Sequence, residues 1–378
     1  MKTKRLPRIG LSVDRVAEHG YRILLGIVRY WQGQGGCDFR SVDANPEEWP
    51  GLLKTHRCLG AIVEANSPER MEAARGLSLP VVNVSSRFDL TGVVNATTDD
   101  HAIGVMAAEY LLQRGFRRFG YVGMPTRFSR VRLDGFLGRL AQAGLGCTCV
   151  PDAIADDLEH GLPAWVARLE KPVAFFACND RRGLRMVQFC SRAGIRIPEE
   201  LAIVGCDDDP IECEISEVPL SSVDPGFENV GYQAARTLHR LLAGHRPPGG
   251  NVLVPPQRVV VRRSSNFLAV DDPGVAKALR YISEHATEPI TIDDVAAGVS
   301  LSRRNLERRY RAALNRAPGD DLRQARLSLA KQTLMETSLP MPMIAERSGF
   351  SDAKVFGMTF RRQTGLTPSQ FRAQFRTY

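Results

Sequence analysis

Two stretches near the C-terminus repeat one pattern: "LSRRNLERRYRAALNRAP" at 301–318 and "FSDAKVFGMTFRRQTGLTP" at 350–368. Both contain a serine, a short spacer, apolar and aromatic residues, basic residues and then a proline. In the first copy Leu306 and Tyr310 stand four positions apart, so they share one face of a helix. The second copy places two phenylalanines in the same relation. Each stretch therefore predicts a short helix with a buried apolar face and a basic outer face.

A shorter helical pattern precedes each copy. The first ends near Gly298 and the second near Gly349, and each glycine opens a tight turn. Helix, short turn and second helix with a basic outer face is the pattern of a helix-turn-helix, whose second helix enters the major groove of DNA. We expect two such units, at about 291–314 and 341–364, joined by a rigid helix over 319–337.

The positive charge of the chain is concentrated in the same region. From Arg303 to Tyr378 there are 15 Lys and Arg against 6 Asp and Glu, whereas the preceding 302 residues hold 35 against 36. Concentrated positive charge favours docking of a polyanion such as DNA. A solubilising helical face explains the charge equally well when the charge is considered alone.

Residues 291–372 resemble the DNA-binding domain of AraC-type regulators. The matching motifs are "LSRRNLERRYR", "ARLSLAKQTL" and "MPMIAERSGFSDAKVFGMTFRRQTGLTP". The resemblance implies that the two units read successive major-groove segments of duplex DNA. It also implies contacts with base edges and with phosphates. The residues implied for base edges are Arg304, Asn305, Arg308 and Lys354. Those implied for phosphates are Arg311, Arg361 and Arg362, and Arg303 is a further DNA-binding residue.

The second unit departs from the family pattern. Met358 stands where the family usually has an arginine, and Val355 where an aromatic residue is common. We therefore expect the second unit to position the protein on DNA more than to discriminate bases. For any single arginine, phosphate contact or plain solvation is as good an interpretation as base reading. A plain helical bundle with a basic surface is the alternative for the whole domain.

The first 260 residues alternate short apolar runs with longer amphipathic ones. Strands that are apolar throughout belong to a sheet covered by helices on both faces, which indicates a parallel, doubly wound α/β architecture. We expect two such halves, roughly 8–115 and 116–245. The strand candidates are 8–13, 60–65, 80–85, 118–123, 173–178 and 201–206, and the helix candidates are 100–115, 181–194 and 228–244, each ending on a glycine.

The sequence predicts a domain boundary near residue 265. An extended stretch at 251–263 is followed by "NFLAVDDPG" at 266–274, which we interpret as a linker, and strand signals then stop. We expect a ligand-binding domain at 1–265, a linker at 266–274 and an all-α domain at 275–378. The helices expected after the linker are 274–286, 291–298, 302–314, 319–337, 341–347, 352–364 and 367–377.

Residues 8–265 resemble the periplasmic-binding-protein-like sensor domains of LacI-type regulators. The matching motifs are "DDHAIGVMAAEYLLQRGFRRFGYVG", "RLDGFLGRL", "ACNDRRGLRMVQFCSRAGIRIPEELAIVGCDDDP" and "PLSSVDPGFENVGYQAARTLHRLL". Only seven residues precede the first strand, so we expect no LacI-type N-terminal DNA-binding head. Together the two resemblances imply a two-lobed sensor joined to an AraC-type domain, a homodimer that binds repeated half-sites, and contact with RNA polymerase.

Polar residues follow several of the predicted strands. In open α/β sheets, ligands bind beyond the carboxyl ends of the strands, and sugar hydroxyls need the acceptors and donors found there. The resemblance assigns sugar contacts to Arg132, Asn179 and Asp207. Our hypothesis is that a pentose such as D-xylose closes the two lobes and that the chain activates sugar catabolism genes. The candidate ligand-binding residues are Asp14, Arg132, Asn179, Asp180 and Asp207.

Several of these residues have other interpretations. Asp180 can equally well cap the helix at 181–194, and Asp208 and Asp209 fit solvated loop positions better than ligand contacts. An aromatic ring often stacks on a sugar face. The sequence does not rank the candidates Tyr21, Phe39, Phe88 and Phe128.

Motifs of the common enzyme classes are missing from the sequence. "GQGGC" at 33–37 follows a helical pattern instead of the strand that a dinucleotide loop needs, and His101, His160, His239 and His245 stand alone. The eight cysteines lack paired metal-site spacing and are expected to be buried thiols. We expect no enzyme activity, no cofactor and no metal. The remaining alternatives are a sugar-capture protein of a transport system and a sugar-modifying enzyme with a DNA-binding tail.

Membrane and export signals are also missing. No apolar stretch approaches the ~20 residues that cross a bilayer. The basic start "MKTKRLPRIGLSV" lacks the apolar region of a signal peptide. We therefore expect a cytoplasmic protein.

Overall fold

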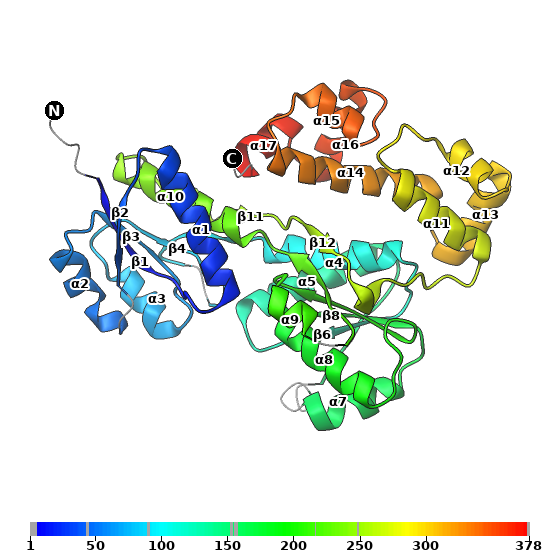
Figure 1. The fold of residues 1–378 in the computed structure, drawn as a ribbon, viewed down its shortest axis with the longest axis horizontal. Helices are drawn as coiled ribbons and strands as arrows, with labels where there is room; N and C mark the ends of the chain where they lie inside the picture. Colours follow the sequence, from blue (N-terminus) through cyan, green and yellow to red (C-terminus); the bar gives the residue numbers. More distant parts are fainter. Residues whose placement is uncertain are drawn as a thin grey trace.

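The computed structural model describes residues 6–42, 45–88, 91–151, 154, 158–215, 217–247 and 249–375. Two α/β lobes lie side by side, and a helical domain lies along the second lobe and reaches the first lobe at its C-terminal end (Figure 1). Each lobe is built on one six-stranded sheet, as the doubly wound prediction requires. None of the described helices is both long enough and apolar enough to span a bilayer.

Both sheets are parallel over most of their strands. The first lobe has the order β11 (Val252–Val254), β5 (Val94–Thr98), β4 (Val81–Asn83), β3 (Gly60–Val63), β1 (Arg8–Ser12), β2 (Asp38–Ser41). The second has the order β12 (Arg258–Val260), β10 (Ser221–Asp224), β9 (Leu201–Cys206), β8 (Val173–Ala177), β6 (Phe119–Val122), β7 (Thr148–Cys149). Only β12, at an edge, pairs antiparallel with its neighbour among the described strands.

Helices cover both faces of each sheet. In the first lobe α1 (Glu18–Gly33) and α10 (Phe227–Leu242) cover one face, and α2 (Trp49–Thr55) and α3 (Pro68–Arg75) cover the other. In the second lobe α4 (Asp100–Gln113) and α5 (Arg127–Gln142) cover one face, and α7 (Leu158–Ala167) and α8 (Asp180–Arg192) cover the other. The short helix α9 (Pro210–Glu214) follows β9.

One helix pair in each lobe packs backbone to backbone through glycines. A Cβ atom on Gly26 of α1 would lie 1.8 Å from the Glu228 carbonyl oxygen, and one on Gly231 of α10 would lie 1.8 Å from that of Ile23. In the second lobe Gly104 of α4 and Gly135 of α5 make the equivalent close approaches. Only glycine permits such contact, so these positions fix how each pair crosses.

The division into contiguous halves at 8–115 and 116–245 was wrong. Helix α4 follows a strand of the first lobe but packs on the second, and α10 follows a strand of the second lobe but packs on the first. The chain therefore crosses between the lobes three times, at 98–100, 224–227 and 254–258. The third crossing is hydrogen-bonded to the other two, since Asp99 N donates to the Val254 carbonyl at 2.7 Å and Gln257 N donates to the Asp224 carbonyl at 2.8 Å. Helical periodicity carries no information on which sheet a helix covers.

All six predicted strands are present, but others were missed. Strands β5 "VNATT" and β10 "SSVD" are polar in sequence although Asn95, Thr97, Ser221 and Ser222 are buried. Their side chains are paired internally; Asn95, for example, donates to Asn251 Oδ1 at 2.9 Å. The extended stretch at 251–263 contributes one strand to each lobe, β11 and β12.

The described part of the C-terminal domain has seven helices, and their bounds lie within one residue of the prediction, except that the predicted end of the last helix, residue 377, lies outside the described residues. The helices are α11 (Pro273–His285), α12 (Ile292–Gly298), α13 (Arg303–Leu314), α14 (Pro318–Glu336), α15 (Met341–Arg347), α16 (Ala353–Thr364) and α17 (Pro368–Phe375). Side chains cap several of them, with Ser302 accepting from Asn305 N and Asp352 from Lys354 N. One small core joins α11–α13 to the start of α14, and a second joins the rest of α14 to α15–α17.

Candidate ligand cleft and candidate DNA-binding surface

Arg132 on α5 is one of the two predicted ligand-binding residues that are buried, the other being Asp180. The Arg132 side chain is 4% exposed, and its Nε donates to Asp100 Oδ1 at 3.0 Å while Nη1 donates to the Cys178 carbonyl at 2.5 Å. Nη1 also lies 3.6 Å from Asp207 Oδ1. The Phe128 ring covers the guanidinium at 4.9 Å. Two carboxylates and an aromatic face thus fix the orientation of this fork of donors.

Asp207 follows β9 at the carboxyl edge of the second sheet. Its backbone has φ of 125°, a conformation that L-residues rarely adopt, and its side chain is 29% exposed. Burial raises the pKa of the Asp207 carboxyl to about 6, against the opposing charge of Arg132. The geometry leaves this carboxylate partly open beside a fixed arginine, an arrangement suited to accepting hydrogen bonds from hydroxyl groups.

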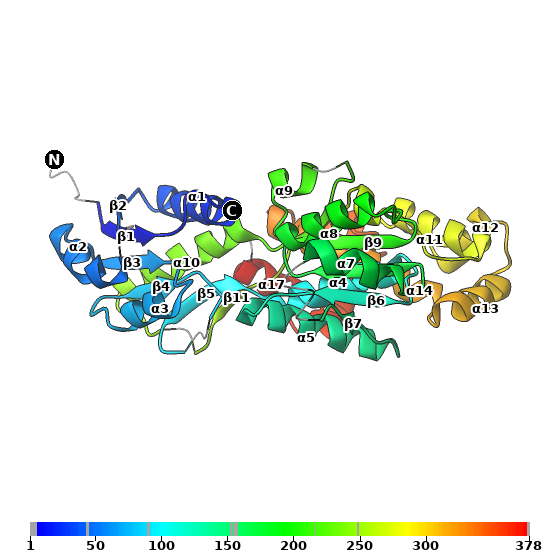
Figure 2. The ribbon, with the colours of Figure 1, turned by 90° about the horizontal axis from the view of Figure 1, so that it is seen from below.

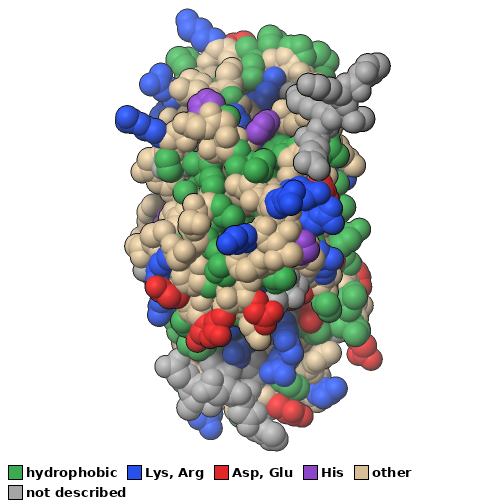
Figure 3. Space-filling view, turned by 90° about the vertical axis from the view of Figure 1, so that its left-hand side faces the viewer, with side chains coloured by type: hydrophobic (Ala, Val, Ile, Leu, Met, Phe, Trp, Pro, Cys, Tyr) green, Lys and Arg blue, Asp and Glu red, His purple; other side chains and the backbone are tan. Residues whose placement is uncertain are grey.

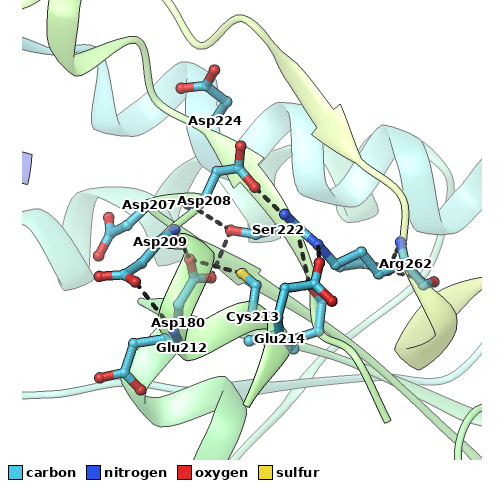
Figure 4. Close-up of polar contacts among 12 residues, drawn as sticks. Asp180, Asp207, Asp208, Asp209, Glu212, Cys213, Glu214, Ser222, Asp224 and Arg262 are labelled. Carbon is cyan, nitrogen blue, oxygen red and sulfur yellow. Dashed lines mark hydrogen bonds and ion pairs between the residues drawn. The ribbon is translucent and has the colours of Figure 1, made fainter. Parts of the chain in front are cut away.

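Asn179 and Asp180 follow β8, but their side chains have structural partners. Asn179 Oδ1 accepts from Arg182 N at 3.0 Å and so caps α8. The alternative prediction that Asp180 is the cap was wrong by one residue. Asp180 is buried, and its carboxylate accepts from Ser222 Oγ at 2.6 Å and from Asp209 N at 2.9 Å (Figure 4). Burial, reinforced by the charge of Asp207, raises the pKa of Asp180 to about 7.

Asp208 and Asp209, which were interpreted as solvated loop positions, instead have partners within the protein. Asp208 Oδ1 lies 2.9 Å from Arg262 Nη1, and Asp209 caps α9 by accepting from Ile211 N and Glu212 N (Figure 4). Together with Asp180, these contacts fix the loop that carries Asp207.

The first lobe contributes Asp14 and two residues that were not predicted. Asp14 accepts hydrogen bonds from Val16 N and Ala17 N, and the first of these is the main cause of its lowered pKa. Glu64 follows β3 and accepts from Asp14 N at 3.0 Å and from His19 Nε2 at 3.1 Å. Burial disfavours the charged form of His19, but the hydrogen bond and charge of Glu64 raise its pKa. Glu64 was missed because the strand predicted at 60–65 includes this residue, whereas β3 ends at Val63.

Arg22 on α1 connects the two lobes and was also missed. Its Nη1 donates to the Asp207 carbonyl at 3.0 Å, and its Nη2 lies 2.7 Å from Asp224 Oδ1. A second contact between the lobes joins Arg127 N to the Arg87 carbonyl at 3.0 Å. The two lobes are thus held together across the edge that carries the polar residues.

The aromatic candidates lie in different surroundings. Phe128 covers Arg132, and Phe39 packs against the core of the first lobe. Tyr21 is exposed near the start of α1, and Phe88 is half-buried after β4. Phe128 is thus the one candidate with a described contact to a predicted ligand-binding residue.

On the helical domain the predicted DNA-binding residues lie on α13 and α16. Arg303 is paired with Asp293 at 3.1 Å and with Glu307 at 2.9 Å. Arg308 donates to Asn305 Oδ1 at 3.0 Å. The exposed members of the set are Arg303, Arg304, Arg308, Arg311, Lys354, Arg361 and Arg362, whereas Asn305 is half-buried. Opposite them, Leu306, Tyr310, Phe356 and Phe360 are buried, as the sequence pattern predicts.

Charge on the far end of the first lobe is distributed differently. Seen from that end, basic and acidic side chains are interspersed with apolar ones (Figure 3). This agrees with the near balance of charges before residue 303.

The cysteine prediction holds only in part. Cys178, Cys190, Cys206 and Cys213 are buried, but Cys149 is exposed. A hydrogen bond from Cys147 lowers the pKa of the Cys149 thiol to about 7. Across the described residues, His, Cys, Asp and Glu side chains do not gather in groups of three that could hold a metal ion.

Comparison with known proteins identifies both parts of the chain. Residues 108–265 match the family model of a periplasmic binding protein-like domain, and residues 295–374 match that of a helix-turn-helix domain. The chain is 29% identical to the xylose operon regulatory protein of Escherichia coli K12 over 98% of each chain. The same-named protein of Haemophilus influenzae is 27% identical over 83% of this chain and 84% of its own length.

A solved structure extends the likeness to the whole chain. The structure of a xylose-binding transcription activator matches with a TM-score of 0.62 and 27% identity over 100% of both chains. The chain is an AraC-type transcription regulator with a periplasmic-binding-protein-like sensor domain. The regulator also shares the fold of a CelR–cellobiose complex, with a TM-score of 0.56 over 70% of this chain and 86% of the other.

Proposed function

We propose that the regulator binds a pentose, with D-xylose as the first candidate, between its two lobes and activates genes of pentose catabolism. Its similarity to the two xylose operon regulatory proteins and to a xylose-binding activator supports this choice of sugar. It acts by binding alone, without catalysis, as a homodimer in the cytoplasm that contacts repeated DNA half-sites and RNA polymerase. A ligand shifts such a protein only through different affinities for its two states.

The observation that carries the proposal is the buried guanidinium of Arg132 beside the partly open carboxylate of Asp207. In the proposed complex Arg132 donates to sugar oxygens, and Asp207 and Asp14 accept from sugar hydroxyls. Asn179 Oδ1 caps α8, so the sugar contact is assigned to the Nδ2 group of Asn179. We assign to Asp180 the role of holding the loop of Asp207, because its carboxylate already accepts from Ser222 and Asp209.

On the DNA side, we propose that the sensor ends at residue 265 and that the DNA-binding domain begins at residue 275, after the segment 266–274. The roles assigned to its residues follow those expected from the family. Arg304, Asn305, Arg308 and Lys354 contact base edges, and Arg311, Arg361 and Arg362 contact phosphates. Arg303 is held by Asp293 and Glu307 beside the same surface.

Isothermal titration calorimetry with a panel of pentoses and hexoses tests the ligand. We expect heat with D-xylose and loss of that heat in Asp207→Ala. Heat with none of the sugars, or unchanged binding by Asp207→Ala, contradicts the proposal. Retardation of a promoter fragment at low ionic strength, with and without D-xylose, tests the DNA-binding half.

A further inference from the structure

The DNA-binding domain is attached to both lobes of the sensor, through the first helix-turn-helix unit on one side and through α17, the helix that follows the second unit, on the other. The first unit, α12 and α13, lies beside the second lobe, and the last helix, α17, lies against α10 of the first lobe (Figures 1 and 2). The single helix α14 joins them. Its 19 residues span about 28 Å at 1.5 Å per residue.

The attachment to the second lobe is extensive and reciprocal. Arg117 Nη1 of the sensor donates to the Leu314 carbonyl at the end of α13, at 3.0 Å. In return, Arg316 Nη2 donates to the Leu112 carbonyl near the end of α4, at 2.7 Å. Each arginine thus donates to a carbonyl near the end of a helix of the other domain, and the Leu112 carbonyl accepts from Gly115 N at 3.0 Å as well. Gln324 of α14 adds a hydrogen bond to Glu109.

Residues 267–270 reinforce this attachment. Phe267 and Ala269 pack against the core of the second lobe, and Leu268 and Val270 pack against the core of the first helix-turn-helix unit. Ala269 N also donates to the Arg114 carbonyl at 2.8 Å. The segment interpreted as a linker from sequence is thus a strip that fastens two cores together by alternate side chains.

The attachment to the first lobe is smaller. Asn229 Nδ2 of α10 donates to the Phe375 carbonyl at 2.5 Å, and Arg236 Nη1 donates to the Ala373 carbonyl at 3.3 Å. Both acceptors lie in the last turn of α17. A cavity of about 650 Å³ between α10, residues 246–252 and α17 adjoins these contacts. Few buried contacts support this end, so it opens at a lower free-energy cost than the other.

We infer that the α17–α10 contact senses the angle between the lobes, so that lobe movement releases the second helix-turn-helix unit while the first stays fastened to the second lobe. Helix α14 is fastened to the second lobe through Gln324, and α17, which packs in the same core as the end of α14, is docked on the first lobe. The two attachments therefore cannot both persist when the lobes turn. This inference rests on the proposed DNA-binding function and specifies how that function is regulated. The coupling is reciprocal, so DNA that holds the second unit away from α10 changes the affinity of the cleft for its ligand.

The arrangement of α13 is consistent with this control. Asn305 and Arg308, proposed to read bases, line a cavity of about 670 Å³ whose other wall includes Arg117 and Arg118 of the sensor. When the first unit binds DNA, Arg117 and Arg118 of the sensor therefore lie next to its DNA-binding surface. Release of the second unit is then the step that changes the spacing between the two groove-reading helices.

Hydrogen–deuterium exchange of the full chain, measured without sugar, tests the inference. Arg22→Ala removes the Arg22 contact between the lobes, leaves the one between Arg127 and Arg87, and touches no described residue of the DNA-binding domain. We expect the amides of residues 369–375 to exchange about tenfold faster in this variant, which corresponds to ~1.4 kcal/mol. The amides of α13 should stay within about twofold of the parent. Asp224→Asn, which removes the charge of the partner, provides a second variant should Arg22→Ala not fold.

A negative control and a positive control accompany these variants. Arg196→Ala breaks an arginine–carboxylate pair with Glu200 inside the second lobe and should leave α17 unchanged. Arg236→Ala breaks the α17–α10 contact directly and should speed exchange at α17 without any change in the lobes. Unchanged exchange of α17 in Arg22→Ala and Asp224→Asn overturns the inference, as does unchanged exchange in Arg236→Ala. Since no sugar is present, these outcomes are separate from failure of D-xylose to bind, which overturns the proposed function.

Discussion

Arg132 and Asp100 form an ion pair in which neither side chain is more than 4% exposed. Asp100 begins α4 and Arg132 lies on α5, so the pair joins the two helices that cross through Gly104 and Gly135. Asp100 Oδ2 has no hydrogen-bond partner among the described residues. The pair therefore does two things: it holds the proposed ligand-binding arginine in place and leaves one buried acceptor atom beside it.

Arg132→Ala should be strongly destabilising as well as unable to bind sugar. The substitution leaves the Asp100 carboxylate buried without its counter-charge, which costs about 3–5 kcal/mol. Urea unfolding followed by circular dichroism measures the loss. Arg196→Ala, which breaks an exposed pair with Glu200, should cost about 0–1 kcal/mol. Equal losses in the two variants would show that the Arg132 pair contributes nothing beyond a surface contact.

Sugar affinity should fall as the solution is acidified. The pKa of Asp207 is raised to about 6, so below that pH its carboxyl is protonated and no longer accepts from two hydroxyls. Binding favours the carboxylate and draws the proton off, so the dissociation constant should be about tenfold higher at pH 5 than at pH 7. Calorimetry across that range measures it. In Asp207→Asn the binding that remains should lose this pH dependence; if it persists there, another group is responsible.

Arg308→Ala and Arg362→Ala should weaken DNA binding in different ways. Loss of a base contact at Arg308 should cost about 1–3 kcal/mol and relax the preference at one base position. Loss of a phosphate contact at Arg362 should weaken binding to all DNA sequences alike. It should also reduce the slope of the logarithm of the binding constant against the logarithm of the salt concentration by about one. Fluorescence anisotropy with operator variants at several salt concentrations separates them. Identical behaviour of the two variants would contradict the division into base and phosphate contacts.

Gly104→Ala should destabilise the second lobe. Its Cβ would lie 1.9 Å from the Arg132 carbonyl oxygen, so α4 and α5 must move apart at a cost of about 1–3 kcal/mol. Gly138→Ala on α5 is the matched control, because a Cβ there meets nothing within 4 Å. That variant should gain about 0.4–1 kcal/mol from the stiffer unfolded chain. Thermal unfolding of both proteins gives the comparison, and a stable Gly104→Ala would refute the close approach.

Local signals were sufficient for the DNA-binding domain. Caps such as Ser302 and Asp352, and turn glycines such as Gly349 with φ of 75°, act within a few residues of the chain. Each helix boundary could therefore be predicted from its neighbours. The same holds for the apolar strands β8 and β9.

Long-range features were not accessible in this way. The swap of α4 and α10 between lobes depends on which sheet each helix covers, and β5 and β10 are polar strands whose side chains are paired inside the lobes. At the proposed ligand site, the sequence placed Asn179 and Asp207 directly after predicted strands, and in the structure they follow β8 and β9. The sequence could not show that Asp100 faces Arg132 or that Arg22 reaches Asp224, since those partners are 32 and 202 positions apart.

The alternation of Phe267, Leu268, Ala269 and Val270 between two cores limits how such regulators can be recombined. Inserting one amino acid within this strip would exchange the facing of the strip residues that follow the insertion, presenting sensor-facing groups to the helix-turn-helix core and the reverse. A chimera that exchanges sensors should therefore place its junction after Asp272, so that the transferred sensor includes residues 267–270. The recipient DNA-binding domain should keep the residues equivalent to Leu314 and Arg316, which contact the sensor. In a fusion joined at residue 265, Phe267 and Ala269 would come from a different protein than the lobe against which they pack.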